Sequence, residues 1–359
     1  MTREELALLW FDYNDVGFSK TERILKKFNQ IDDIFNKNIV KNAIFDKEDE
    51  KELQNKMLEI NEENFSKMIE EEFYKYNISA VTFVSKEYPE KLKNLSEPPL
   101  VLYTRGDTSL LSKKSIAIVG TRKPTDYGKL ITEKWTKTLS SAGLVTVSGL
   151  AYGTDTLVAE TTLSCGGKTI AVLAGGLDSI YPYQNKELAE RISKNGLLVS
   201  EQRPKVKPLN YLFVTRNRIV SALGLGTLIV EAGSKSGTMT TARHAIDQGR
   251  ELFVVPGNIN SPQSEGTNKL IDEIPDTFTI SPDRILERLK IKKSKSSAPS
   301  IQVDLLQSQI LEVLENGALS FDELAEKTGI SSSSLSTELI KMEMFGLVKK
   351  GNSNTYLKI

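Results

Sequence analysis

Two short segments of the chain carry the residue types that bind phosphate. Ser236-Gly237-Thr238 follows the apolar run 227–230 and opens a stretch with helical character. The first N–H groups of a helix have no partner within the helix, glycine admits a ligand closely, and hydroxyls add donors. Upstream, Arg216-Asn217-Arg218 supplies two guanidinium groups, whose forks match phosphate oxygens better than an ammonium does. The first hypothesis is therefore a phosphate-bearing partner.

Two further turns could contribute to such a site. Gly120-Thr121-Arg122 follows a strong apolar run, and Ser148-Gly149 closes the next one. A single glycine after a strand is weak evidence, and the Gly-x-Gly-x-x-Gly dinucleotide pattern is not met. Taken alone, the first segment is read as a plain turn, whereas Asp155 is expected to cap the helix that follows the second.

Few residues suit catalysis or metal binding. Asp178 and Glu231 are the carboxylates best placed for chemistry, and nothing pairs them. His244 is the single histidine, and its apolar helical surroundings favour a structural role. Cys165 has no activating base nearby, and no His/Cys cluster has the spacing of metal ligands. We therefore expect a binding protein without a cofactor rather than an enzyme.

Composition limits the partner without naming it. The 359 residues include 47 basic and 47 acidic side chains, so the formal net charge is zero, which argues against a broad basic surface that coats duplex DNA. A local basic groove remains compatible with this balance. No apolar run is long enough for a transmembrane helix, the N-terminus does not resemble a signal peptide, and the lone cysteine suits a cytoplasmic protein.

The central part of the chain alternates apolar runs with helix-length segments. The runs are short, rich in Val and Ile and mostly without alternation, as in strands buried on both faces: 115–119, 144–147, 169–173, 197–199, 227–230 and 252–255. The helices are expected at 125–142, 155–165, 185–195 and 238–248. This pattern predicts a doubly wound, Rossmann-like α/β sheet whose ligand crevice lies at the carboxyl ends of the strands.

The flanking regions differ in character. Residues 1–77 read as a helical N-terminal domain of the SAM or helix–hairpin–helix type, with Ser19 as an N-cap; the imperfect turn at Val16-Gly17-Phe18 is not assigned DNA binding. Residues 78–289 form the α/β core, and the basic, Ser-rich segment 290–300 reads as a linker. Residues 301–359 predict a winged helix, with N-caps at Ser320 and Ser331 and a capping box to Glu323.

Taken together, the core motifs resemble the DprA (Smf) family of DNA-processing proteins. They stand in the family's order over about residues 78–289 and are highly specific in combination: Ile118-Val-Gly-Thr-Arg122, Val147-Ser-Gly-Leu-Ala-x-Gly153, Gly176-Leu-Asp-x-Ile-Tyr-Pro182, Phe213-x-x-Arg-Asn-Arg218, Glu231-Ala-x-x-x-Ser-Gly-Thr238 and Gly249-Arg-x-x-x-x-Val-Pro-Gly257.

The resemblance implies a non-catalytic protein that binds and protects single-stranded DNA and loads the recombinase RecA onto it during natural transformation. It also implies single-strand-binding protein as a second partner and a homodimer as the working unit. Carried onto this chain, the phosphate site comprises Gly120, Thr121, Arg122, Ser148, Gly149, Arg216, Asn217, Arg218, Ser236, Gly237 and Thr238.

Departures from the family pattern concern specific contacts. The family commonly has a histidine after Gly-Ile-Asp, where this chain has Val158-Ala159, and Tyr183-Gln184 stand where a basic residue is often found. Leu270–Pro275 also differs, in a region that the resemblance implies lies near the dimer and RecA-binding surface.

Two rival functions remain open at this stage. A LOG-like phosphoribohydrolase shares the fold, but its glutamate is replaced here by Thr241, and a hydroxyl cannot stabilise an oxocarbenium ion as a carboxylate does. A transcription regulator acting through the winged helix would read duplex DNA, although its third helix offers Lys341 among serines and glutamates.

Overall fold

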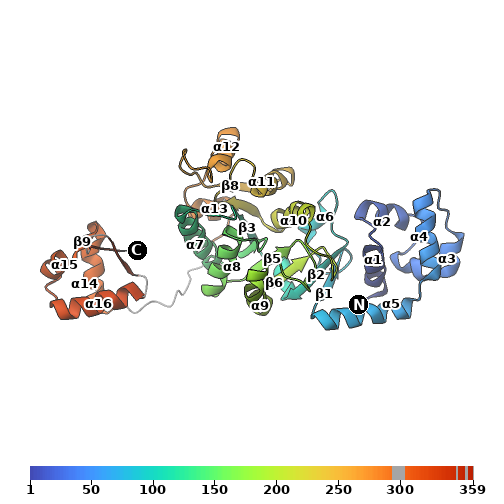
Figure 1. Ribbon diagram of the computed structural model, residues 1–359, viewed down its shortest axis with the longest axis horizontal. Coiled ribbons are helices and arrows are strands. Elements are labelled where there is room, and N and C mark those ends of the chain that lie inside the picture. Colours follow the sequence, from blue (N-terminus) through green and yellow to red (C-terminus); the bar gives the residue numbers. More distant parts are fainter. Residues whose placement is uncertain (293–303, 345–346, 352–354, 359) are drawn as a thin grey trace. The chain divides into compact units, whose positions relative to one another are not determined.

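The computed structural model describes residues 1–292, 304–344, 347–351 and 355–358, and these divide into two compact units, residues 1–294 and 295–359. Figure 1 labels the helices and strands of both units. Most of the predicted linker 290–300 lies outside the described residues. Among the helices that the structure describes, none combines the length and apolarity needed to cross a membrane.

The chain begins with a helical segment. Its elements are α1 (Arg3–Tyr13), α2 (Phe18–Leu25), the 3₁₀ helix η1 (Ile31–Phe35), α3 (Lys37–Asn42), α4 (Glu48–Glu59) and α5 (Glu62–Tyr76). Thr2 and Glu5 form a capping box that satisfies N–H groups at the start of α1. The predicted N-cap at Ser19 is wrong, because Gly17 occupies that position and Ser19 lies in the first turn of α2, where its hydroxyl donates to Glu97.

An eight-stranded sheet follows, and it has the predicted doubly wound form. Its strands are β1 (Ser79–Thr82), β2 (Val101–Gly106), β3 (Ser115–Val119), β4 (Val145–Ser148), β5 (Thr169–Leu173), β6 (Leu197–Ser200), β7 (Gly226–Ile229) and β8 (Glu251–Val254). Their order is β1-β2-β6-β5-β4-β3-β7-β8, and the strands from β6 to β8 in this order are parallel. Sequence analysis located these six but missed β1 and β2, which add to β6 in antiparallel fashion.

Helices cover both faces of the sheet (Figure 1). The elements are α6 (Glu90–Lys93), η2 (Thr108–Ser112), α7 (Asp126–Ser141), α8 (Thr154–Ser164), η3 (Tyr183–Asn185), α9 (Lys186–Asn195), α10 (Asn210–Leu223), α11 (Gly237–Asp247), α12 (Glu265–Glu273), η4 (Pro275–Thr277) and α13 (Pro282–Arg288). One apolar cluster joins the sheet to α6, α10 and α11, and another joins it to α7, α8 and α13. The strands are therefore buried on both faces, which is why they read as unbroken apolar runs.

The second unit has the predicted winged-helix elements. They are α14 (Leu305–Val313), η5 (Leu314–Asn316), β9 (Leu319–Ser320), α15 (Phe321–Thr328), α16 (Ser332–Met344), β10 (Val348–Lys350) and β11 (Thr355–Lys358). The strands pair in the order β10-β11-β9. The predicted capping box between Ser320 and Glu323 is present, and Ser331 accepts the N–H of Ser334 at 3.4 Å, as expected of an N-cap.

The helical segment and the sheet share one hydrophobic cluster. This cluster contains Leu6–Phe11 of α1 and also Val101 and Tyr103 of β2, so one compact unit holds both parts. Within it, the Tyr103 hydroxyl donates to Asp12 at 2.6 Å. Arg203, from the loop after β6, also joins the two parts. It donates to the Asp12 carbonyl at 2.9 Å and to the Asp15 carboxylate at 2.7 Å. Burial raises the pKa of Asp12 to about 6, although the Tyr103 hydrogen bond and Arg203 oppose the shift.

We expect Asp12 to make folding stability depend on pH. A carboxyl whose pKa is raised in the folded chain contributes most at acidic pH, and its contribution is lost as the pH rises through about 6. Asp12→Asn keeps an acceptor for Tyr103 but cannot ionise. Relative to wild type, this variant should therefore gain about 1 to 2 kcal/mol of unfolding free energy between pH 5 and pH 8. Urea unfolding at both pH values measures the gain, and an unchanged difference between the two proteins would contradict the assignment.

Candidate functional site

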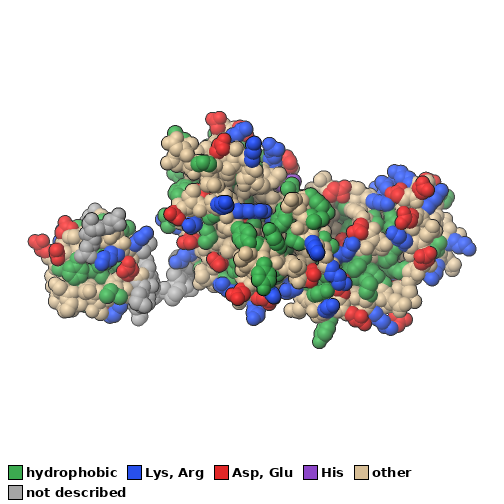
Figure 2. Space-filling model, in the orientation of Figure 1, with side chains coloured by type: hydrophobic (Ala, Val, Ile, Leu, Met, Phe, Trp, Pro, Cys, Tyr) green, Lys and Arg blue, Asp and Glu red, His purple; other side chains and the backbone are tan. Residues whose placement is uncertain are grey.

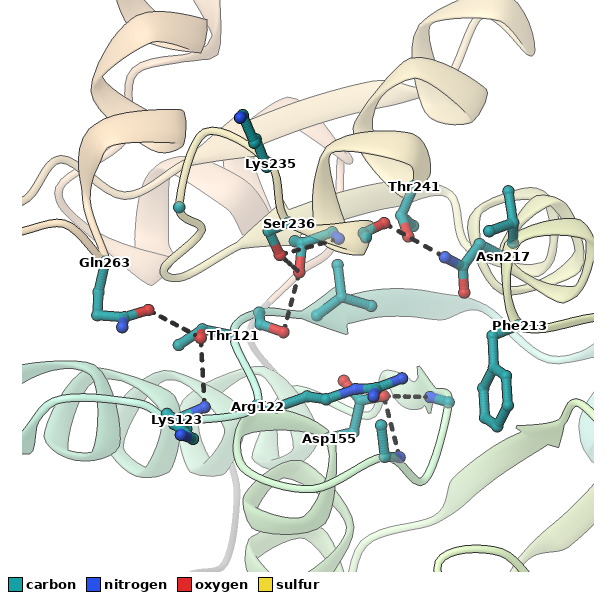
Figure 3. A pocket seen from close by; sticks show the side chains of 18 of the residues that line it. Thr121, Arg122, Lys123, Asp155, Phe213, Asn217, Lys235, Ser236, Thr241 and Gln263 are labelled. Carbon is teal, nitrogen blue, oxygen red and sulfur yellow. Dashed lines mark hydrogen bonds between the residues drawn. The ribbon is translucent and has the colours of Figure 1, made fainter. Parts of the chain in front are cut away.

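A pocket of about 720 Å³ opens at the carboxyl edge of the sheet (Figure 3). It lies beside β3 and β7, where the strand order reverses, and this is where doubly wound sheets bind ligands. Its walls come from the segments that follow β3, β4 and β7, from α10 and from the loop after β8. Its lining includes Gly120, Thr121, Arg122, Lys123, Gly149, Asp155, Asn210, Phe213, Arg216, Asn217, Ser234, Lys235, Ser236, Gly237, Thr238, Thr241, Gln263 and Glu265.

Backbone hydrogen bonds shape the segment after β3. The N–H of Thr121 donates to the Glu231 carbonyl at 2.8 Å, and its hydroxyl donates to Gln263 at 2.9 Å. The same hydroxyl accepts the N–H of Lys123 at 3.2 Å. Gly153, at φ +76°, packs so tightly here that a Cβ would lie 2.6 Å from the Arg122 backbone. The turn is thus anchored on both sides, and the Arg122 side chain projects into the open pocket (Figure 3).

The start of α11 forms the opposite wall. Ser236 is the N-cap, and its hydroxyl accepts the N–H of Thr238 at 3.2 Å. The Thr238 hydroxyl donates to the Gly120 carbonyl at 2.9 Å and so joins the two walls. Space around Gly237 is open, with nothing within 4 Å of the position a Cβ would take. The positive end of an 11-residue helix dipole therefore faces the pocket at a place a ligand can reach.

Three exposed cations line the pocket: Arg122, Lys123 and Lys235. None of the three forms an ion pair with any residue that the structure describes. The Arg122 guanidinium lies 5.6 Å from the centroid of the Phe213 ring, which holds it by a cation–π contact at the side of the pocket. Their charges are consequently available to an anionic ligand.

Arg216 has a different role from the one its sequence pattern suggests. Its side chain is buried, and Nη1 donates to the Gly149 carbonyl at 2.6 Å and to the Val172 carbonyl. Burial lowers the pKa of Arg216 to about 10, while the charge of Asp155 opposes the shift. The guanidinium is therefore a positive charge in the pocket floor that is already committed to the ends of β4 and β5. Gly149 is required there, because a Cβ would meet Nη1 and Nη2 at 2.5 Å.

Asp155 organises the floor as the counter-charge of Arg216. Its carboxylate accepts the N–H groups of Gly149 at 3.1 Å and Ala151 at 3.2 Å, and burial raises its pKa. The expectation that Asp155 caps the following helix is wrong, because Gly153 is the N-cap of α8 and the carboxylate binds the loop that precedes it.

Two predicted site residues do not line the pocket. Arg218 forms an ion pair with Glu201 at 2.5 Å, since a spacing of two positions on α10 directs it away from Arg216. Ser148 is buried and donates to the Ile118 carbonyl at 2.9 Å, which ties β4 to β3. Asn217 does line the pocket, and its amide donates to the Gly237 carbonyl at 3.4 Å.

Sequence analysis missed six polar residues of the lining: Lys123, Asn210, Ser234, Lys235, Gln263 and Glu265. Lys123 and Lys235 directly adjoin predicted segments, so charge next to a glycine turn was an available signal. Gln263 belongs to the loop after β8, for which the sequence contains no comparable cue.

The carboxylates considered for catalysis have structural partners. Glu231 accepts the N–H of Thr125 at 2.9 Å and its hydroxyl at 2.6 Å, at the start of α7. Asp178 accepts the N–H of Lys205 at 2.8 Å. The described residues include no cluster of His, Cys, Asp or Glu that would hold a metal ion. The arrangement suits binding of an anion more than bond cleavage.

We expect Arg216→Ala to destabilise the fold and Arg122→Ala to leave it intact. Removing the buried guanidinium leaves two carbonyls without their donor and takes away the positive charge near the buried Asp155 carboxylate. Each buried group left unsatisfied costs about 1 to 3 kcal/mol. Arg122 is exposed, so its truncation should change the unfolding free energy by less than about 0.5 kcal/mol. Thermal or urea unfolding of both variants checks this, and equal stability of the two would contradict the assigned roles.

The fold defines a doubly wound α/β protein with an appended winged helix, and its pocket is lined by cations and a helix N-terminus. Residues 79–290 match the model of the DNA recombination-mediator protein A family, and residues 294–351 match the DprA winged helix domain. The chain therefore belongs to the DNA recombination-mediator protein A family, the DprA/Smf proteins.

Individual relatives agree with this assignment. The chain is 44% identical to DNA processing protein DprA of Bacillus subtilis over 55% of its own length and 66% of that protein, just under two thirds. It is 35% identical to protein Smf of Escherichia coli over 74% of this chain and 73% of that one.

Two solved structures are similar. DprA of Streptococcus pneumoniae matches with a TM-score of 0.62 and 30% identity over 80% of this chain and 93% of that one. DNA processing protein A of Helicobacter pylori, whose structure was determined for its single-stranded DNA binding mode, matches with a TM-score of 0.54 and 35% identity over 59% of this chain and 95% of that one.

Proposed function

We propose that this chain binds single-stranded DNA through the pocket at the carboxyl edge of the sheet and delivers it to a recombinase. The observation that carries the proposal is the Arg122 guanidinium, which has no ion-pair partner among the described residues. It lies against the Phe213 ring and lines the same pocket as the N-terminal end of α11. A cation and a helix N-terminus hold phosphate, whereas an aromatic ring offers a face to a base. The H. pylori relative, which binds single-stranded DNA, supports the same ligand.

Binding is expected to be independent of sequence. The pocket presents backbone N–H groups, hydroxyls and cations, which contact the sugar–phosphate backbone. Phosphate contacts set affinity and its salt dependence, whereas stacking tolerates every base because each has a π-face. The proposed DNA contacts are those of Arg122, Lys123, Asn217, Ser236, Gly237 and Thr238, with Gly120, Thr121 and Gly149 shaping the walls.

The rival functions have less support. Thr241 lines the pocket where a phosphoribohydrolase would need its glutamate, and the Glu231 carboxylate is bound to Thr125. In the winged helix, the Lys341 ammonium pairs with Glu338 at 2.7 Å, which leaves less charge on α16 for a duplex backbone.

We expect Arg122→Ala to weaken binding to an oligothymidylate and to flatten its salt dependence. Loss of one phosphate contact lowers the slope of log K against log[salt] by about 0.7 on single strands. Fluorescence anisotropy from 50 to 300 mM salt measures the slope. Arg191→Ala is the matched control, because Arg191 is exposed on α9 and does not line the pocket. An unchanged slope in the Arg122 variant, or a preference of wild type for duplex DNA, would contradict the proposal.

Loading of RecA is the proposed outcome of this binding, in the cytoplasm and on strands covered by single-strand-binding protein. The family's description as a recombination mediator supports it.

The working unit is proposed to be a homodimer, which sedimentation analysis of the full chain tests. The departures at 270–275 lie at the end of α12 and the start of η4, where Leu270 is buried and thus takes part in the fold itself.

We expect wild type to shorten the lag before RecA hydrolyses ATP on strands coated with single-strand-binding protein, and Arg122→Ala to lengthen it again. Delivery requires that the mediator hold the strand, so loss of a phosphate contact should delay filament formation. Naked DNA is the control, since RecA needs no mediator there. A wild-type protein without effect on the coated strand would refute the loading role while leaving DNA binding intact.

A further inference from the structure

A row of exposed tyrosines continues from the pocket along the carboxyl edge of the sheet. Tyr152 belongs to the loop between β4 and α8, and Tyr181 and Tyr183 lie between β5 and α9. Their exposed fractions are 39%, 49% and 74%. Because β3, β4 and β5 are adjacent and parallel, their carboxyl ends follow one another along this edge, from Arg122 to the tyrosines.

The row is connected to the pocket by ring contacts. The Tyr181 ring meets the Phe213 ring edge-on, with centroids 5.6 Å apart and an interplanar angle of 66°. The same Phe213 ring makes the cation–π contact with the Arg122 guanidinium. On the far side, the Lys186 ammonium lies 5.9 Å from the centroid of the Tyr183 ring. The aromatic rings along this edge are therefore flanked by a cation at each end, Arg122 and Lys186. In Figure 2, Lys and Arg side chains adjoin hydrophobic ones in the middle of the α/β body.

The two loops that carry the tyrosines are fixed to each other. The Tyr152 hydroxyl donates to Gln184. The buried amide of Asn185 donates to the Leu150 carbonyl and to the Thr156 hydroxyl, both at 2.9 Å. Leu150 has a left-handed backbone at φ 56°, which persists only where the surroundings hold it. Rings on such loops are positioned before a ligand arrives, so little ordering entropy is lost on binding.

Exposed rings that lie beside cations match a ligand with flat apolar faces and a charged backbone. Elsewhere in the sheet a tyrosine is buried, as Tyr103 is in the core. Here three tyrosines face solvent near Arg122 and Lys186, which form no ion pair with any described residue, and a nucleic acid strand supplies both complementary parts. We propose that Tyr181 and Tyr183, supported by Tyr152, form a stacking platform for bases that lie beyond the phosphate pocket on the same single strand. This inference rests on the proposed function and extends its binding site.

The platform changes what would hold a strand along this edge. Tyr183 contributes a ring, and the Gln184 side chain accepts a hydrogen bond from the Tyr152 hydroxyl. Part of the affinity along this edge should then come from stacking, which salt weakens far less than it weakens phosphate contacts.

Tyr183→Ala tests the platform in the full-length chain. Its affinity for a long oligothymidylate should fall about five- to a hundredfold, the range of a lost base–aromatic stack, with an unchanged salt slope. Tyr183→Phe should bind like wild type, because it keeps the ring. Tyr74→Ala is the matched control, since Tyr74 is 92% exposed on α5 of the helical segment. An oligonucleotide with abasic sites should bind wild type and Tyr183→Ala with equal affinity.

The outcomes separate this inference from the proposed function. If wild type fails to bind single strands, or Arg122→Ala keeps the full salt slope, the pocket itself is refuted. If the pocket behaves as proposed but Tyr183→Ala binds the normal strand like wild type, or loses equally on the abasic strand, the platform is overturned and these tyrosines are left to protein contacts. Photo-crosslinking of a 5-bromouracil strand to the Tyr181–Tyr183 peptide, identified by mass spectrometry, would support the platform directly.

Discussion

The buried guanidinium of Arg216 is the interaction on which the site depends. From α10 it reaches under the floor of the pocket and ties the carbonyls of Gly149 and Val172, at the carboxyl ends of β4 and β5. Asp155 balances its charge and at the same time binds two N–H groups of the adjoining loop. The shape of the floor, the absence of a side chain at Gly149 and the position of the loop after β4 all follow from this one contact.

The three arginines near the pocket have different roles: two support the structure, and one is free to contact a ligand. Arg216 is buried in the floor, Arg218 is paired with Glu201, and Arg122 is exposed above the pocket. Arg216 already donates to two carbonyls, and Arg218 points away from the pocket, although the charge of Arg216 still favours an anion nearby. The exposed arginine can therefore be replaced without loss of the fold, whereas the buried one sets the geometry that the exposed one uses.

Much of this arrangement could be predicted from the sequence, and there are physical reasons why the rest could not. The parallel strands read as unbroken apolar runs because both of their faces are covered. β1 was missed because it is an antiparallel edge strand that is only partly buried. β2 lies between β1 and β6 and is largely buried, so its apolar run was an available signal that was overlooked. Glycine and hydroxyl residues after β3, β4 and β7 indicated the place of the pocket. The roles of Arg216 and Arg218 were not readable, because burial and the partner Glu201 are set by tertiary packing.

The junction between the helical segment and the sheet has a consequence for dissection of the protein. Apolar side chains of α1 and β2 belong to one cluster, and Tyr103 reaches across it to Asp12. Cutting the chain near residue 77 would expose the apolar side chains of the sheet that pack against α1, and it would leave the Tyr103 hydroxyl without its acceptor. An isolated α/β core would therefore tend to self-associate, and fragments intended for crystallisation or assay should retain the first five helices.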